Sequence, residues 1–281
     1  MELLSHPDFA LLHPTGQPFE QQDRIRVLYE HFGSVGEGGE AAPADLERCH
    51  TPEHVERIRS LSGPTALDAV TVASETSWRA ALLAAGTAIE AARRGGFALV
   101  RPPGHHALPG RAMGFCLFNN VAIAARWAQA ELELGRVAIV DFDVHHGNGT
   151  QAIFAGDRSV LYASIHRWPY YPGTGGPDEQ GETLVNVPLP PGVGDEELLA
   201  GFAAIEGAVR AFEPELLLVS AGFDLHREDP LSDTDVGDDC FRELGRRCAG
   251  LAPRIAAVLE GGYNLATLPG LVETAWEGFQ N

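Results

Sequence analysis

Residues Gly135 to Thr150 read GRVAIVDFDVHHGNGT and hold the most informative pattern in the chain. The stretch opens with the apolar run Val137–Val140, which is rich in β-branched residues and carries no charge. Such a run is typical of a strand buried on both faces of a parallel sheet, although a buried helix segment has the same pattern. Gly147 and Gly149 are expected to end it. The stretch therefore predicts a central strand followed by a turn.

Three polar side chains follow this run at a spacing of two residues, namely Asp141, Asp143 and His145. In an extended backbone this spacing directs all three to the same side. Two carboxylates and an imidazole that converge are unfavourable unless a cation lies among them, and such ligands suit a catalytic Zn²⁺. If Asp141 has another role, a third ligand must come from elsewhere. Taken alone, the motif has a second interpretation, a solvated loop after a strand.

Length and composition favour one globular α/β domain over residues 1–281, with a hydrophobic content of 44%. No uncharged apolar run is long enough for a transmembrane helix, and the first residues lack the pattern of a signal peptide. The four cysteines form no CxxC pair, which is typical of reduced, buried thiols. We therefore expect a cytoplasmic protein without a membrane partner.

The formal net charge of −19 argues against a nucleic-acid partner and favours cationic ligands. All 20 basic residues are arginine, because the sequence contains no lysine. This composition excludes any mechanism that uses a lysine nucleophile or a lysine Schiff base.

Apolar runs and helical patterns alternate along most of the chain. Residues 1–44 show no clear element, and a long Pro/Gly-rich loop is expected from Ser164 to about Pro191. The alternation predicts a mainly parallel sheet with helices on both faces. We expect strands at Phe97–Val100, Val137–Val140, Val160–Ser164, Leu216–Val219 and Ile255–Leu259, and helices at Thr51–Leu61, 75–94, Asn119–Leu134, Asp195–Phe212, Phe241–Leu251 and Leu268–Phe279.

Polar residues follow every one of the five predicted strands. In an open α/β sheet, ligands bind outside the carboxyl ends of the strands. The five runs would bring to one rim the groups His105-His106, Asp141 to His145, His166 with Tyr170-Tyr171, Ser220 to Asp224, and Glu260 to Tyr263.

This set of motifs resembles the zinc-dependent histone deacetylase-like amidohydrolases of the arginase/deacetylase superfamily, which include bacterial acetoin-utilisation proteins and acetylpolyamine amidohydrolases. The resemblance covers about residues 45–280 in one collinear run and is closest to class II and bacterial members. It rests on the blocks Arg101–Ala107, Gly114–Asn120, Asp141–Gln151, Tyr171–Gly175, Ser220–Leu231 and Leu259–Asn264.

The resemblance implies that Asp143, His145 and Asp224 bind one Zn²⁺ per chain. Asp141 is then free to form a hydrogen bond with His105. It also implies that Asp141 and Ser164 contribute to a structural site for a monovalent cation, usually K⁺.

The resemblance further assigns the catalytic residues. His105 and His106 resemble the tandem histidines of the family, with His106 as the general base and acid and Asn148 as its orienting partner. Tyr263 resembles the donor to the developing oxyanion. The substrate-binding set would comprise the aromatic walls Phe115 and Tyr171 together with Gly114 and Gly262.

The implied function is hydrolysis of the amide of acetyl-lysine, in a peptide or protein, or of a small acetylated amine. The short loop Gly63–Asp68 lacks the insertion that builds the dimer of the polyamine enzymes, so the oligomeric state stays open. The block before residue 44 matches the family poorly, and Arg24 is its only candidate for the arginine of the internal exit channel.

Two alternatives remain. An acyl-ligand binding protein on the same scaffold would not need both tandem histidines and Tyr263. An arginase-like Mn²⁺ ureohydrolase would need an Asp-x-His-x-Asp block, whereas residues 141–145 read Asp-x-Asp-x-His. Of the other histidines, His146, His166 and His226 are expected to be structural neighbours of the site, and the surface is expected to hold His6, His13, His31, His50 and His54.

Overall fold

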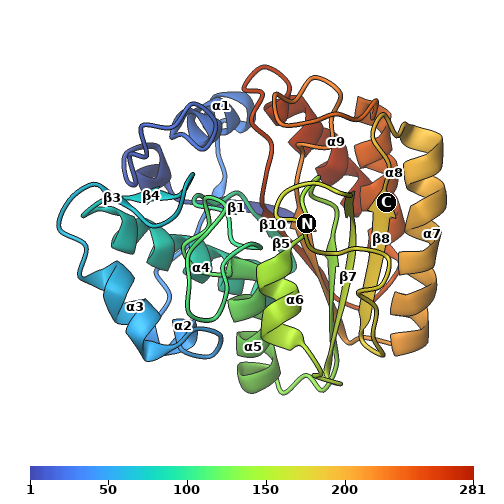
Figure 1. Ribbon diagram of the computed structural model, residues 1–281, viewed down its shortest axis with the longest axis horizontal. Helices are drawn as coiled ribbons and strands as arrows, with labels where there is room; N and C mark the ends of the chain where they lie inside the picture. Colours follow the sequence, from blue (N-terminus) through green and yellow to red (C-terminus); the bar gives the residue numbers. More distant parts are fainter.

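The computed structural model describes all residues from 1 to 281 and contains one large sheet between two layers of helices (Figure 1). Every strand pairing in this sheet is parallel, as the alternation of strands and helices predicts. From edge to edge the strands are β2 (Gly36–Glu37), β1 (Glu2–Ser5), β5 (Gly96–Ala98), β10 (Ile255–Leu259), β9 (Leu216–Ala221), β6 (Val137–Asp141), β7 (Val160–Arg167) and β8 (Leu184–Leu189).

Strand β6 lies between β9 and β7, and all five of its residues are buried. This position explains why its sequence is uniformly apolar, since side chains on both faces meet helices rather than water. The prediction of a central buried strand is confirmed. Its carboxyl end is at Asp141, so the polar residues beyond it leave the sheet at its middle.

Helices cover both faces of the sheet (Figure 1). Helices α4 (Ser77–Arg94) and α5 (Asn120–Glu131) pack against each other on one face, and α7 (Asp195–Phe212), α8 (Asp238–Ala249) and α9 (Leu268–Phe279) lie on the other. The shorter elements are α1 (Asp23–Phe32), α2 (Pro43–Leu46), α3 (Pro52–Arg59), α6 (Asn148–Phe154), the 3₁₀-helix η1 (Pro7–Ala10) and a small hairpin of β3 (Thr65–Ala66) and β4 (Val72–Ala73). No helix combines the length and the apolar character needed to cross a membrane.

The ends of the helices follow local sequence signals. Thr51 caps α3 by accepting a hydrogen bond from the backbone N–H of His54, and Pro52 occupies the first turn. Gly95 ends α4 in the left-handed conformation at a φ of 72°. Asn119 caps α5 by accepting from the N–H of Ala122 at 3.0 Å.

Four elements differ from the sequence-based expectation. The predicted long loop contains β8, whose Pro188 is compatible with its position at the sheet edge. The N-terminal residues supply β1 and α1, which are short or mostly polar. Gly149 lies inside helix α6 instead of in a turn, and the position requires glycine because a Cβ there would lie 2.3 Å from the carbonyl oxygen of Ala107.

Candidate active site

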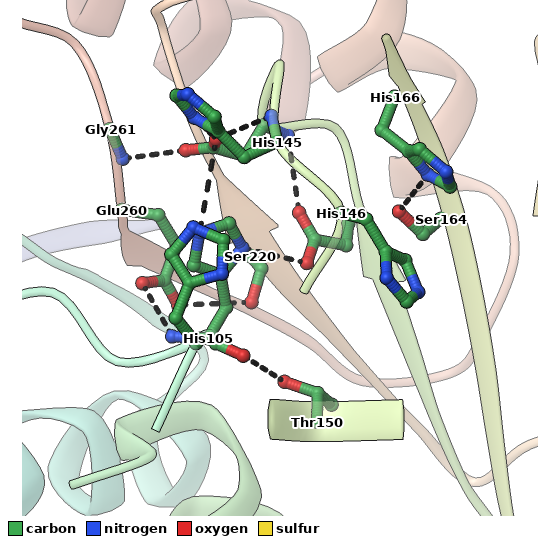
Figure 2. A network of polar contacts seen from close by, with 12 residues as sticks. His105, His145, His146, Thr150, Ser164, His166, Ser220, Glu260 and Gly261 are labelled. Carbon is green, nitrogen blue, oxygen red and sulfur yellow. Dashed lines mark hydrogen bonds and ion pairs between the residues drawn. The ribbon is translucent and has the colours of Figure 1, made fainter. Parts of the chain in front are cut away.

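The carboxyl ends of β5, β10, β9 and β6 carry the polar residues to one buried centre, as the rim of the predicted sheet indicates. Figure 2 shows the network that joins His105, His145, Ser220 and Glu260 there. These side chains come from four separate parts of the sequence.

Asp143, His145 and Asp224 form a cluster in which one ligand atom of each lies within 4.8 Å of the others. His145 Nδ1 lies 3.0 Å from Asp143 Oδ1 and 3.1 Å from Asp224 Oδ2. The backbone leaves room for nothing larger than glycine beside them, since a Cβ on Gly261 would lie 2.1 Å from Asp224 Oδ2.

The electrostatics of this cluster fit a bound cation. Burial, and then the neighbouring Asp143 carboxylate, raise the pKa of Asp224 to about 7. Burial opposes the charge of His145, but the two carboxylates beside it raise its pKa to about 9. Apart from its ion-pair contact with His145, Asp224 Oδ2 is buried and accepts no hydrogen bond. Two carboxylate oxygens and one imidazole nitrogen, with one oxygen that accepts no hydrogen bond, are a donor set that suits Zn²⁺ with an open coordination position.

Asp141 does not join the cluster, although the spacing of two predicts that it points to the same side. Asp141 is the last residue of β6, and the chain leaves the extended conformation only beyond it, so the period of two does not continue to Asp143 and His145. Its Oδ2 lies 3.1 Å from His105 Nδ1 and accepts from the Tyr162 hydroxyl at 3.0 Å. The structure thus brings Asp141 and His105 together.

The tandem histidines have opposite environments. Burial lowers the pKa of His105, but the nearby carboxylates of Asp143 and Asp141 outweigh burial and raise it to about 10. Burial, reinforced by the charges of His105 and His145, holds the pKa of His106 well below its usual range. His106 Nδ1 donates to Asn148 Oδ1 at 2.8 Å. A neutral His106 with its proton on Nδ1 has a free electron pair on Nε2.

A pocket of about 270 Å³ opens beside this centre. Phe115 and Tyr263 meet edge to face with ring centroids 5.7 Å apart, and Tyr171 stands against His106 with centroids 5.1 Å apart. Tyr170, to which the sequence assigns no role, stacks on His145 at 5.5 Å. The lining residues are Phe19, Val70, His106, Gly114, Phe115, His145, Tyr170, Tyr171, Leu231 and Tyr263.

The two glycines of the expected substrate-binding set differ in their relation to this pocket, since only Gly114 lines it. Gly114 has a φ of 57°, and a Cβ there would lie 2.4 Å from the His106 ring. Gly262 has a φ of 118° and is not part of the lining. Its carbonyl accepts from Arg24 Nε at 2.7 Å, and the guanidinium of Arg24 lies 4.9 Å from the centre of the Tyr263 ring.

Ser164 lies opposite Asp141 in the pairing of β7 with β6. Its hydroxyl lies 2.8 Å from His166 Nδ1, and His166 Nε2 lies 2.9 Å from the carbonyl oxygen of Gly175. His166 and its neighbour His146 are both buried beside the site.

The expectation that His13, His50 and His54 lie on the surface is wrong, since all three are buried. Each ring finds a partner that no local pattern reveals. His54 Nε2 donates to the carbonyl oxygen of Leu117 at 2.8 Å, and His50 Nε2 accepts from the backbone N–H of Asn119 at 2.9 Å.

Sequence reasoning also left Glu260 and Asp229 without a role. Both are buried acids next to the functional residues, and Asp229 Oδ2 accepts from the backbone N–H of Tyr263 at 2.6 Å. A polar residue directly after an apolar strand was the available signal for Glu260. No comparable signal marks Asp229.

Comparison with known proteins places the chain among deacetylases. The family model described as "Histone deacetylase domain" matches residues 19–279. A "Probable deacetylase" of Methanothermobacter thermautotrophicus is 43% identical, over 94% of this chain and 86% of that protein. "Histone deacetylase 15" of Arabidopsis thaliana is 40% identical over 95% of this chain, and the match spans only 53% of the plant protein. The solved structure of the "HDA15 HD domain" superposes with a TM-score of 0.93 at 37% identity, covering 99% of this chain and 91% of that one.

Proposed function

This chain belongs to the histone deacetylase family, and from that premise we propose that it is a zinc-dependent amidohydrolase that removes the acetyl group from acetylated lysine. We propose that residues 1–281 form one catalytic domain. The observation that carries the proposal is the convergence of three features on one pocket: the Asp143–His145–Asp224 cluster, a neutral His106 and the Tyr263 phenol.

Asp143, His145 and Asp224 are the residues that would hold the metal. When bound, Zn²⁺ supplies a Lewis acid for the amide carbonyl and lowers the pKa of a water molecule towards about 7. Gly261 supports the cluster, because its backbone N–H donates to Asp143 Oδ2 at 2.8 Å. That hydrogen bond orients one of the carboxylate ligands.

His106 is the proposed general base. Its free Nε2 can take a proton from the attacking water, and the resulting imidazolium can then return the proton to the leaving amine. Asn148 keeps the other proton on Nδ1. The positive charge favoured on His105 by Asp141 suppresses premature protonation of His106.

Tyr263 is the proposed donor to the oxyanion that forms on the amide carbonyl. Burial raises the pKa of this phenol well above its usual range, so it keeps its proton at neutral pH and can donate a hydrogen bond. Removing one such donor typically lowers the rate by about 10²–10³-fold.

The pocket lining favours acetyl-lysine over an acetylated polyamine as the substrate. The aromatic walls Phe115 and Tyr171 suit an aliphatic stem, as the resemblance implies. The lining itself holds no carboxylate, and the acid at its edge, Asp68, accepts a hydrogen bond from the backbone N–H of Gly114 at 3.2 Å. A monovalent cation at Asp141 and Ser164 and a cytoplasmic location stay predictions.

The alternatives have less support. A ureohydrolase with two metal ions would need further carboxylates, whereas one group of three potential ligands is present. An acyl-ligand binding protein would not need the hydrogen bond that fixes the tautomer of His106.

Turnover of an acetyl-lysine peptide and of an acetylated polyamine by the Zn²⁺-loaded protein tests the proposal. We expect hydrolysis of the peptide, and a kcat about 10²–10³-fold lower for Tyr263→Phe with the same zinc content. A Zn²⁺-loaded protein that turns over neither substrate would contradict the deacetylase function. Faster turnover of the polyamine would contradict only the substrate class.

A further inference from the structure

Glu260 is a fully buried acid that the proposed mechanism does not use. It comes directly after β10, which lies between β5 and β9 in the sheet, so its side chain can reach residues of both neighbouring segments. Figure 2 shows it between Ser220 of β9 and the backbone of His105.

The carboxylate of Glu260 accepts three hydrogen bonds. Its Oε2 accepts from the backbone N–H of Gly104 at 2.7 Å and from that of His105 at 3.1 Å. Its Oε1 accepts from the hydroxyl of Ser220 at 3.1 Å. The guanidinium of Arg24 binds the backbone carbonyl of Glu260 at 2.5 Å and not its carboxylate.

A buried carboxylate without an ion-pair partner is destabilising, so its presence needs another explanation. Burial raises the pKa of Glu260 to about 7, which is the sign of that unfavourable environment. An apolar side chain of similar size would fill the same space. It would, however, leave two buried N–H groups without an acceptor.

The backbone that Glu260 holds is the one that carries the tandem histidines. The carbonyl of His105 is fixed on its other side by the N–H groups of Gly149 and Thr150, at 3.0 and 3.1 Å. Gly104 lies close against α5, because a Cβ there would lie 2.5 Å from the N atom of Asn120. Glu260 therefore holds this segment at its N–H groups, which none of these other contacts engages.

Glu260 is also covalently close to the opposite wall of the site. Gly261 binds Asp143, and Tyr263 comes two residues after Gly261. One segment of four residues thus connects the histidine backbone, the ligand cluster and the phenol.

We propose that Glu260 is a positioning residue whose carboxyl group fixes the backbone of Gly104 and His105 and thereby sets the place of His106 relative to Tyr263. This inference rests on the proposed deacetylase function. It assigns to the carboxyl group a geometric role, as an acceptor of two N–H groups, and not a role for its charge.

The test compares Glu260→Leu with Glu260→Gln. Leucine has no acceptor, whereas glutamine keeps one oxygen for the two N–H groups and can donate to Ser220, whose hydroxyl can rotate to accept. We expect Glu260→Leu to lower kcat by about 10²-fold with KM changed less than about twofold, because a displaced catalytic group slows the reaction without removing substrate contacts. Glu260→Gln should restore most of the activity, with an unchanged pH profile and zinc content.

Hydrogen–deuterium exchange supplies a readout that does not depend on activity. We expect the amides of Gly104 and His105 to lose protection in Glu260→Leu and to keep it in Glu260→Gln, in metal-free and Zn²⁺-loaded protein alike. Ser220→Ala is the control, because it removes only the third hydrogen bond and should leave protection of both amides intact.

The outcomes separate the two proposals. Absence of turnover by the wild type overturns the deacetylase function, while the exchange comparison still decides the role of Glu260. Full activity or retained protection in Glu260→Leu overturns the positioning role, and so does a Glu260→Gln variant that is equally slow with a shifted pH profile. If Glu260→Leu does not fold, Glu260→Asp withdraws the carboxyl by one methylene and should reproduce the loss of kcat and of protection.

Discussion

The hydrogen bond between His106 and Asn148 determines whether His106 can act as a base. An amide oxygen can only accept, so the contact at 2.8 Å places a proton on Nδ1 and leaves Nε2 free. The amide group of Asn148 is itself oriented, because its Nδ2 faces the sulfur of Met113 at 3.4 Å. Burial and the charges of His105 and His145 keep the pKa of His106 low, although the hydrogen bond to Asn148 acts in the opposite direction.

We therefore expect Asn148→Ala to lower kcat by about 10–100-fold with little change in KM, because the ring loses its orientation but not its contact with the substrate. Asn148→Asp keeps the acceptor and adds a negative charge, which favours the protonated form and raises the pKa of His106. The acid limb of the kcat/KM profile of Asn148→Asp should consequently move to higher pH. Steady-state kinetics between about pH 5 and 9 measure both effects. Unchanged kcat in Asn148→Ala would contradict the role of His106 as the base.

At the level of secondary structure, the elements that were predictable from the sequence are those that water does not reach. The runs that form β6, β9 and β10 are apolar because both faces are covered, and their polar ends mark the site. Strand β8 was not predictable, because it lies at the sheet edge and tolerates Asn186 and Pro188.

Within the site, the motif residues were predictable because they are polar groups placed directly after strands. The burial of His50, the support of Tyr263 by Asp229 and the stacking of Tyr170 on His145 depend on contacts between distant segments. Local spacing carries no information on such contacts. For the same reason, the spacing of two alone did not separate Asp141 from the cluster, since the backbone bends beyond Asp141, where the strand ends.

The side chain of Glu179 connects the loop that carries Tyr171 to helix α6. Glu179 Oε1 accepts from the backbone N–H groups of Gly175 and Gly176, at 2.9 and 3.3 Å. Its Oε2 accepts from Gln151 Nε2 of α6 at 2.8 Å. A carboxylate thus connects α6 to the loop of the aromatic wall.

We expect Glu179→Ala to raise KM for an acetyl-lysine peptide about 5–10-fold while kcat changes less than about twofold, since a mobile wall weakens binding of ground state and transition state alike. Asp178→Ala is the matched control, because Asp178 is exposed and forms no side-chain hydrogen bond or ion pair. Steady-state measurement of KM and kcat for both variants tests this prediction. An equal rise of KM in both variants would show that the effect does not come from the hydrogen bonds of Glu179.

On the scale of the whole molecule, several histidines outside the pocket lining are buried as neutral groups. Burial lowers the pKa of His13 to about 4 and, with the nearby His54, that of His50 to about 3. Both ring nitrogens of His50 are engaged, since Nδ1 donates to the carbonyl oxygen of Leu108 at 3.1 Å and Nε2 accepts from Asn119. Protonation of Nε2 would break the contact at the start of α5.

These histidines make the free energy of unfolding depend on pH. Between about pH 6.5 and the lowered pKa, the unfolded chain binds a proton that the folded chain does not, so stability falls as the pH falls. Each such histidine contributes a slope of at most about 1.4 kcal/mol per pH unit in that interval. The contribution is fully present above about pH 6.5 and is lost towards pH 3–4.

We expect His50→Gln to lower stability at pH 7, because the substitution disturbs two buried hydrogen bonds, and to flatten the decline between about pH 6 and 4. Urea unfolding at several pH values gives the slope of the free energy of unfolding against pH for the wild type and for the variant. His31→Gln, at an exposed position on α1, serves as the control and should decline as steeply as the wild type. If His50→Gln kept the wild-type slope, the acid sensitivity would have to come from other groups, such as His13 or the carboxylates. The fold would then tolerate a charged His50 at the start of α5, which would contradict the neutral, doubly bonded ring.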